Sequence, residues 1–287
     1  MLRTRVVTAL ILLAMVVPAL AFLPALGWAL FVLLFVAAAA WEWGRLCGFA
    51  HALALAYAGV TTAVGGVILL GAAEHMRALT LWVYSISAAA WVGIACYWFF
   101  RGPAAPQGAW LAALGWLVLI PCWWALVQAR AAGALFMFLL MGLIWVADIA
   151  AYFAGRRFGR HKLAPAVSPG KTWEGVAGAM LGATVLALLC AATTSANGSL
   201  LDSWFAWIFS YAGRHGAMGV LAALLVVAVV VGLSVLGDLF ESLLKRRAGV
   251  KDSSGLLPGH GGVLDRIDAL IPTMPLAMLI FTLVRNT

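Results

Sequence analysis

The chain has 287 residues, of which 65% are hydrophobic and only 10% are charged. A soluble domain could not keep so much apolar surface from water, so this composition excludes one and predicts a polytopic integral membrane protein of the all-α class. The formal net charge of +8 is interpreted as a signal for membrane orientation, and no nucleic-acid partner is expected.

Nine apolar stretches are candidates for membrane spans, since a helix needs roughly 20 apolar residues to cross the hydrocarbon core. We therefore expect about nine transmembrane helices. They fall at residues 6–24, 26–41, 52–73, 79–100, 109–128, 133–153, 175–195, 217–237 and 269–285.

Polar residues divide the chain into two regions. Residues 1–130 place few polar groups inside their expected helices and are predicted to form a scaffold. Residues 131–287 carry the charged motifs and are predicted to form a catalytic region, with cytoplasmic loops at about 154–174 and 238–268. Glu42 and Glu74 are expected to lie in water at helix ends, without a chemical role.

The tryptophans and cysteines are expected to have structural roles and no chemical ones. Tryptophans near span ends are typical of a belt at the lipid headgroups. The four cysteines have neither metal-ligand nor disulfide spacing and are expected to be small buried residues. These residues are Trp41, Trp43, Trp82, Trp110, Trp123 and Trp124, and Cys47, Cys96, Cys122 and Cys190. Residues 196–216, with Asp202, are expected to form an amphipathic segment at the opposite interface.

Basic residues predict the orientation. With nine spans, Arg3 and Arg5, the basic loop from Arg156 to Lys171, and the stretch from Lys245 to Arg266 fall on one side of the membrane. Cytoplasmic loops carry an excess of Lys and Arg. We expect a bacterial inner membrane, a cytoplasmic N-terminus, a C-terminus outside, and an active site on the cytoplasmic side.

Asp148 is an ionisable residue inside an expected span. Such a residue costs about 2.5–3.5 kcal/mol on insertion scales and is by default a functional or paired site. A structural hydrogen bond to a neighbouring helix stays open as the alternative.

The run Ser168-Pro-Gly-Lys171-Thr-Trp-Glu-Gly175 directly precedes another apolar span. Pro and Gly break the chain, and Thr-Trp-Glu can start a helix whose free N–H groups favour an anion. The spacing does not fit a P-loop.

The stretch from Asp238 to Asp268 concentrates charge. If its start is helical, Asp238, Glu241, Ser242 and Lys245 share one face, and Asp265 and Asp268 follow at i, i+3. The run Pro258-Gly-His-Gly-Gly lies between them, and its glycines let backbone N–H groups approach a phosphate. Acids for a metal therefore flank donors for phosphate.

These motifs resemble those of the phosphatidate cytidylyltransferases. The resemblance covers about residues 145–285, and the first half matches only in hydropathy. The matching runs are Ser242-Leu-Leu-Lys245-Arg246, Lys251-Asp252, Pro258-Gly-His260-Gly-Gly and Asp265-Arg266-Ile-Asp268, with ADIAAYFAGRRFGRHKL and SPGKTWEG as a second block.

The resemblance implies that CTP and phosphatidic acid give CDP-diacylglycerol and diphosphate for phospholipid biosynthesis. It implies Mg²⁺ on Asp238 and Asp265, with Asp268 as a further ligand or partner; a second, monovalent cation is left open. The expected partners are CTP, phosphatidic acid and membrane lipids, and a homodimer is left open.

The other roles are inferred from chemistry. Ser242 and Lys245 would reach phosphate from the helix face of Asp238, while Lys171 and Ser168 contribute from the other loop. Further substrate contacts are assigned to Asp148, Arg246, Lys251, His260 and Arg266, and Gly261 and Gly262 would let the loop fold against the nucleotide.

Two alternatives stay open. A CTP-dependent lipid kinase would need the same CTP, Mg²⁺ and membrane substrate. A secondary transporter would place charges in broken helices of an internal repeat, and no such repeat is visible. A CDP-alcohol phosphotransferase is disfavoured because its DG-x-x-AR motif is absent.

Overall fold

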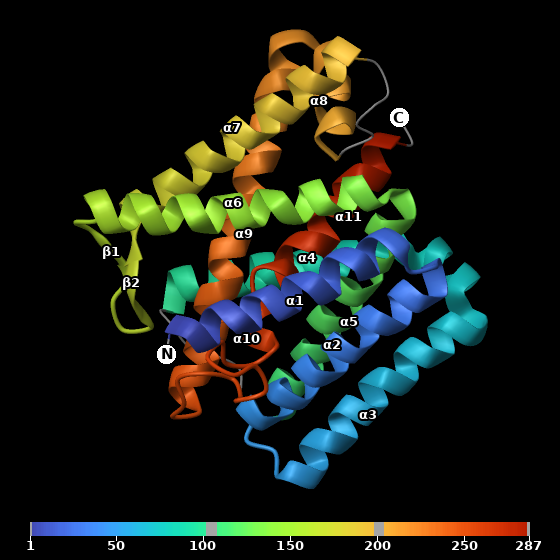
Figure 1. Cartoon of the computed structure of the whole chain (residues 1–287), viewed down its shortest axis with the longest axis vertical. Helices are drawn as coiled ribbons and strands as arrows, with labels where there is room; N and C mark the ends of the chain where they lie inside the picture. The colour runs from blue at the N-terminus through green and yellow to red at the C-terminus, as the bar shows by residue number, and fades with distance from the viewer. Residues whose placement is uncertain (1, 102–107, 198–203, 286–287) are drawn as a thin grey trace.

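The computed structural model describes residues 2–101, 108–197 and 204–285, which form a helical bundle with one small hairpin (Figure 1). Asp202 lies outside the described residues. The elements are α1 (Leu2–Phe22), α2 (Ala25–Leu46), α3 (His51–Val67), the π-helical η1 (Ile68–Ala72), α4 (Ala73–Arg101), α5 (Ala109–Ala132), α6 (Ala134–Phe158), β1 (Lys162–Ala164), β2 (Ser168–Thr172), α7 (Trp173–Asn197), α8 (Trp204–Arg214), α9 (Gly216–Arg247), α10 (Leu264–Ile267) and α11 (Leu270–Arg285).

The all-α membrane architecture is confirmed. Within the described residues, eight helices are long and apolar enough to cross a membrane. The remaining expected span, residues 6–24, corresponds to α1, whose apolar part, Val6–Phe22, is shorter.

The two ends of the bundle differ in character. At one end, the Thr8 hydroxyl of α1 donates to the Pro258 carbonyl at 2.8 Å. At the other end, Arg77, Gln128 and Arg285 line one cavity. The described termini therefore lie at opposite ends of the bundle (Figure 1).

Two expected boundaries were wrong. Helix α9 does not end near residue 237 but continues to Arg247, because Phe240 and Leu244 are buried in the core. The first ten residues of the expected 238–268 loop are therefore helical, which confirms the shared face of Asp238 and Lys245. The expected 154–174 loop begins only after Phe158 and contains the antiparallel β1–β2 hairpin, which the sequence did not predict.

Several tryptophans are core residues, so the prediction of a headgroup belt was wrong for them. Trp43, Trp123 and Trp124 are buried. Their indole N–H groups donate to the Leu111 carbonyl at 2.9 Å, to the Ala29 carbonyl at 3.0 Å and to Thr80 Oγ1 at 3.1 Å. A satisfied indole N–H allows a large ring to pack between helices.

The expected exposure is confirmed for two further tryptophans, and the expected burial for two of the four cysteines. Trp82 and Trp110 are exposed, as a belt requires. Cys122 and Cys190 are buried as expected, but Cys47 is only half-buried and Cys96 is exposed.

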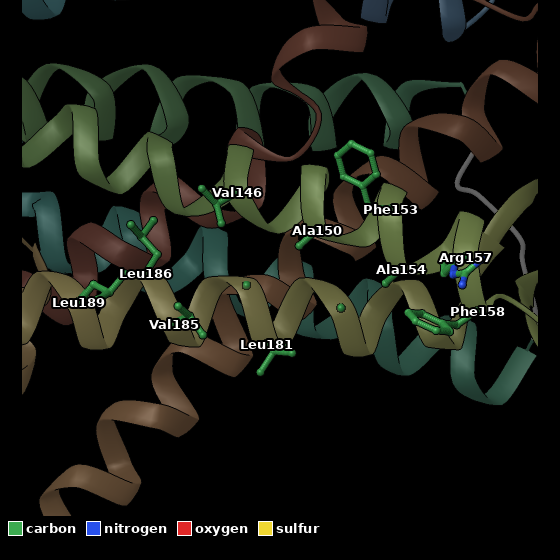
Figure 2. A pocket seen from close by; sticks show the side chains of 12 residues that line it. Val146, Ala150, Phe153, Ala154, Arg157, Phe158, Leu181, Val185, Leu186 and Leu189 are labelled. Carbon is green, nitrogen blue, oxygen red and sulfur yellow. The ribbon is translucent and has the colours of Figure 1, made fainter.

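Small residues join α6 and α7. A Cβ added at Gly182 would lie 2.7 Å from the Ala150 Cβ, and one at Gly178 would overlap the Ala154 Cβ. Figure 2 shows Ala150 and Ala154 along this junction, beside an apolar cavity of about 780 Å³. Such close approach is typical of helix pairs in lipid, and it fixes the hairpin between these helices relative to the bundle.

A buried carboxylate joins the first half of the chain to the loop after α9. Glu42 has no exposed surface and accepts hydrogen bonds from the Ser254 hydroxyl at 2.5 Å and from the amides of Val263 at 3.0 Å and Leu264 at 2.6 Å. The Ser253 hydroxyl lies 3.2 Å away. The prediction that Glu42 lies in water was therefore wrong, because α2 packs against α10 and the free amides at the start of α10 need an acceptor.

The close contact of α6 and α7 at Gly178 predicts that two alanine substitutions change the melting temperature differently. Gly178→Ala should lower the melting temperature in detergent, because overpacking typically costs about 1–3 kcal/mol. Gly142→Ala is the matched control on α6: nothing lies within 4 Å of its added Cβ, and alanine favours a helix by about 1 kcal/mol. Equal melting temperatures for the two variants would contradict the packing argument.

Glu42→Gln should loosen the loop that Glu42 holds. A glutamine has one carbonyl oxygen for the Ser254 hydroxyl and the two amides, so a loss of about 1–3 kcal/mol is expected, with faster amide hydrogen exchange at residues 251–264. Glu74→Gln is the control, because Glu74 is exposed as predicted, with 81% of its side chain accessible. Unchanged hydrogen exchange in Glu42→Gln would show that the loop is ordered without the Glu42 carboxylate.

Candidate active site

A cavity of about 670 Å³ lies at the end of the bundle that carries the hairpin, between α6, β2, α7 and α9 and the loop leading to α10. It unites charged residues from the sequence blocks on either side of α7 and α8. The acids are Asp148, Asp238, Asp252, Asp265 and Asp268; the bases are Arg156, Lys171, Lys245 and Arg266. Asp252 and Arg156 are new to the set of site residues expected from the sequence.

An ion pair joins the two charged blocks. Lys171 Nζ lies 2.5 Å from Asp238 Oδ2. Lys171 projects from β2, whose register with β1 pairs Thr172 with Lys162, and Asp238 projects from α9. Two segments far apart in sequence therefore meet in one cavity.

The first turn of α7 holds the hairpin in place. The amide of Gly175 donates to Thr172 Oγ1 at 3.1 Å, as a helix N-cap requires. Glu174 accepts the amide of His161 at 3.2 Å and lies 2.6 Å from its Nδ1. The helix start expected at Thr-Trp-Glu is therefore confirmed.

Lys245 bridges two carboxylates. Its Nζ lies 2.5 Å from Asp265 Oδ1 and also pairs with Glu241 on the preceding helical turn. Glu241 is 3% exposed, and this ion pair is the one partner that the described part of the chain gives its carboxylate. The sequence placed Glu241 on the correct face but assigned it no role.

Asp265 is held from both sides. While Lys245 pairs with Oδ1, Oδ2 accepts the Ser253 amide at 2.9 Å, the Ser253 hydroxyl at 2.8 Å and the Gly262 amide at 2.7 Å. Ser253 lies in reach of both Glu42 and Asp265, so the buried anchor and the cavity acid are neighbours. Sequence reasoning missed Ser253, since a serine in a polar loop carries no distinctive signal.

Close backbone packing brings Asp268 to the same cavity. A Cβ added at Gly237 would overlap the Asp268 carbonyl oxygen and lie 2.7 Å from Pro272 Cγ, so α9 and α11 approach closely there. The Asp268 carboxylate accepts the Ala269 amide at 2.7 Å. Asp238, directly after Gly237, therefore stands beside the turn that carries Asp268.

Neighbouring carboxylates leave no room for a side chain at the two loop glycines. Gly261 has φ +84°, and an added Cβ would lie 2.7 Å from Asp265 Oδ2. At Gly262 an added Cβ would overlap Glu42 and Ser253. Their predicted approach to a nucleotide stays a prediction.

The remaining predicted site residues do not line this cavity. The Ser242 hydroxyl donates to Asp238 Oδ1 at 3.4 Å, and Arg246 Nε donates to the Val167 carbonyl at 3.4 Å. Ser168 pairs with Ala164 in the hairpin. Lys251 and His260 lie on the loop outside the lining, so their predicted substrate contacts remain predictions.

The donor chemistry of the cavity fits Mg²⁺, which prefers carboxylate oxygens. Among the described residues, no three acidic, His or Cys side chains converge as a ready-made metal site. Asp238 and Asp268 keep acceptor capacity toward the cavity. Asp265 Oδ2 already accepts three hydrogen bonds and Oδ1 pairs with Lys245, so a cation at Oδ1 would compete with Lys245 for that oxygen.

Comparison with known proteins supplies the family. The sequence model of the Cytidylyltransferase family matches residues 3–284. A phosphatidate cytidylyltransferase of Pseudomonas aeruginosa is 39% identical over 285 residues, 96% of this chain and 95% of that protein.

Two further relatives match over shorter ranges. Phosphatidate cytidylyltransferases of Haemophilus influenzae and Thermotoga maritima are 47% and 37% identical over 133 and 154 residues, respectively. These matches cover 46% and 54% of this chain, and 41% and 52% of the relatives. Because the family model spans nearly the whole described fold, including both blocks of the cavity, the chain belongs to the cytidylyltransferase family.

Proposed function

We propose that this enzyme transfers the cytidylyl group of CTP to phosphatidic acid and releases CDP-diacylglycerol and diphosphate. The observation that carries the proposal is the 39% identity to a phosphatidate cytidylyltransferase over 96% of the chain. The cavity supports it, because basic side chains from two segments stand there among acids at one end of a membrane bundle.

The chemistry must bring two anionic substrates together. A phosphate oxygen of phosphatidic acid attacks the α-phosphorus of CTP, and the bond to diphosphate breaks. The second ionisation of a phosphomonoester has a pKa of about 6, so the attacking oxygen is already deprotonated at neutral pH and no general base is needed. Catalysis then consists of positioning and charge neutralisation.

The paired lysines are suited to this task. Lys171 and Lys245 are held at the cavity by Asp238 and Asp265, so both cations are in place before substrate enters. Each can turn to a phosphate oxygen without leaving the cavity, and Arg266 adds a fixed fork of donors.

Mg²⁺ is the proposed cofactor. Asp238 and Asp268 would hold it, and Asp265 would join when Lys245 turns to phosphate. The bound ion supplies charge neutralisation for the triphosphate and for the departing diphosphate.

We also propose that the cavity faces the cytoplasm of a bacterial inner membrane. The end of the bundle with the cavity carries the basic runs Arg156–Lys162 and Lys245–Arg247, whereas Arg77 and Arg285 stand singly at the other end. The positive-inside rule assigns the more basic end to the cytoplasm.

The reaction is tested by the position of the label. With phosphatidic acid and Mg²⁺, radiolabel in the α-phosphate of CTP should enter the lipid and γ-label should leave as diphosphate. Chelation of divalent cations should abolish the transfer, and added Mg²⁺ should restore it. Entry of γ-label into lipid would instead show a CTP-dependent kinase.

Orientation is tested by cysteine accessibility. In a variant whose natural cysteines are replaced by alanine, Arg160→Cys should react with a membrane-impermeant maleimide only in inside-out vesicles. Ala132→Cys, at the other end of the bundle, should react only in right-side-out vesicles. The reverse pattern would place the cavity outside.

The Lys171–Asp238 pair predicts coupled losses. Lys171→Met and Asp238→Asn should each lower turnover on the order of 10²-fold, as is typical for a lost electrostatic contact to the transition state. The double variant should fall well short of the product of the two losses, because both residues would hold one triphosphate in one geometry. Lys162→Met is the control, since Lys162 lies in the same hairpin but is exposed and outside the cavity.

If the loss of turnover in the double variant equals the product of the two single losses, Lys171 acts independently of Asp238 and does not belong to the active site. Protein yield and melting temperature of each variant separate this outcome from a failure to fold.

A further inference from the structure

A second polar cavity lies at the end of the bundle opposite the active site. Its volume is about 440 Å³, and it opens between the start of α4 and the ends of α5 and α11. It shares no lining residue with the active-site cavity. Its polar lining consists of Arg77, Thr80, Tyr84, Gln128, Thr282 and Arg285.

Tyr84 brings an unpartnered hydroxyl group to the lining of this cavity. The side chain is fully buried, and its hydroxyl has no hydrogen-bond partner in the described part of the chain. Buried hydroxyl groups without a partner are rare because they are costly. The neighbouring Thr80 is satisfied, donating to the Met76 carbonyl at 2.8 Å and accepting from Trp124. The hydroxyl of Tyr84 is therefore available to an acceptor that enters the cavity.

The charge of the lining predicts the kind of acceptor. Arg77 and Arg285 both line the cavity, and among the described residues no acidic side chain does. In the part of the chain that the structure describes, Arg77 pairs with the carboxylate of Glu74, which is exposed outside the lining. Two guanidinium groups beside a hydroxyl donor suit a phosphate, which accepts hydrogen bonds only.

The apolar part of the lining predicts a lipid. Met278 and Phe281 of α11 and Ala131 and Ala132 of α5 lie beside the polar groups, at the ends of candidate membrane spans. A phosphate carrying acyl chains matches a cavity that is polar on one side and apolar on the other. Because the lining has two positive charges, a lipid with net negative charge fits better than a zwitterionic one, which brings its own ammonium group.

We propose that this cavity binds the phosphate group of an anionic phospholipid from the leaflet opposite the active site. Arg77 and Arg285 hold the phosphate, the Tyr84 hydroxyl donates to one of its oxygens, and the acyl chains lie against α5 and α11. This site is independent of the proposed reaction.

Binding can be measured on the full chain in phosphatidylcholine-containing detergent, with phosphatidylglycerol as the probe and native mass spectrometry to count the bound lipid. Arg285→Gln and Tyr84→Phe should each weaken the tightest binding step by about tenfold or more, as expected for a charge-assisted hydrogen bond. Arg160→Gln and Tyr57→Phe are the matched controls, since neither residue lines the cavity, and both should bind as the parent does.

The melting temperature gives a second measurement, in which Tyr84→Phe is compared with the parent protein without and with the lipid. Without phosphatidylglycerol, Tyr84→Phe should melt no lower than the parent, because it removes a hydroxyl that has no partner. With phosphatidylglycerol, the parent should gain stability that Tyr84→Phe does not. A lower melting temperature for Tyr84→Phe without the lipid would overturn the proposal.

Three other outcomes would also overturn it. Parent-like phosphatidylglycerol binding by both cavity variants would exclude this site. Equal binding of phosphatidylcholine would remove the requirement for net negative charge. Displacement of the bound lipid by millimolar inorganic phosphate would identify a site for free anions.

Discussion

The buried carboxylate of Glu42 is the constraint on which the candidate active site depends. A charged group without exposed surface is tolerated only when donors surround it, and these donors come from the loop between α9 and α10. The loop is therefore ordered by a residue more than two hundred positions earlier in the chain. Ser253 extends the same arrangement to Asp265, which in turn pairs with Lys245.

Charge compensation organises the rest of the cavity. Lys171 faces Asp238 and Lys245 faces both Asp265 and Glu241, so the lysines and their acids neutralise one another before substrate arrives. Such pairs contribute modestly to stability after desolvation. Their value here lies in position: the basic groups that can hold phosphate and the acids that can hold a cation are already within one cavity.

The first half of the chain does more than support the second. Besides Glu42, the Cys122 thiol on α5 contacts the Leu270 carbonyl at the start of α11, and the ring of Trp43 packs against Phe240 beside the site acids of α9. Helix α11 packs on both α4 and α5. The cavity is thus assembled on a frame drawn from the whole chain, which agrees with a family match over residues 3–284.

Composition and local motifs determined the class of the protein. Long apolar stretches can satisfy backbone hydrogen bonds in lipid only as helices, so the membrane bundle followed from sequence. The motif around Asp238 and Asp265 pointed to the family, and the shared helix face of Asp238 and Lys245 followed from helical periodicity, which depends only on near neighbours.

Tertiary structure decided the partners. The sequence could not reveal that Glu42 is an anchor, that Trp43 lies in the core, or that Lys171 meets Asp238, because each depends on which helices pack together. A hydropathy pattern shows that a helix crosses the membrane, but it does not identify the helix beside it. Between distant segments, contacts arise from the fit of small residues such as Gly178 and Gly237 against their neighbours, and that fit exists only in three dimensions.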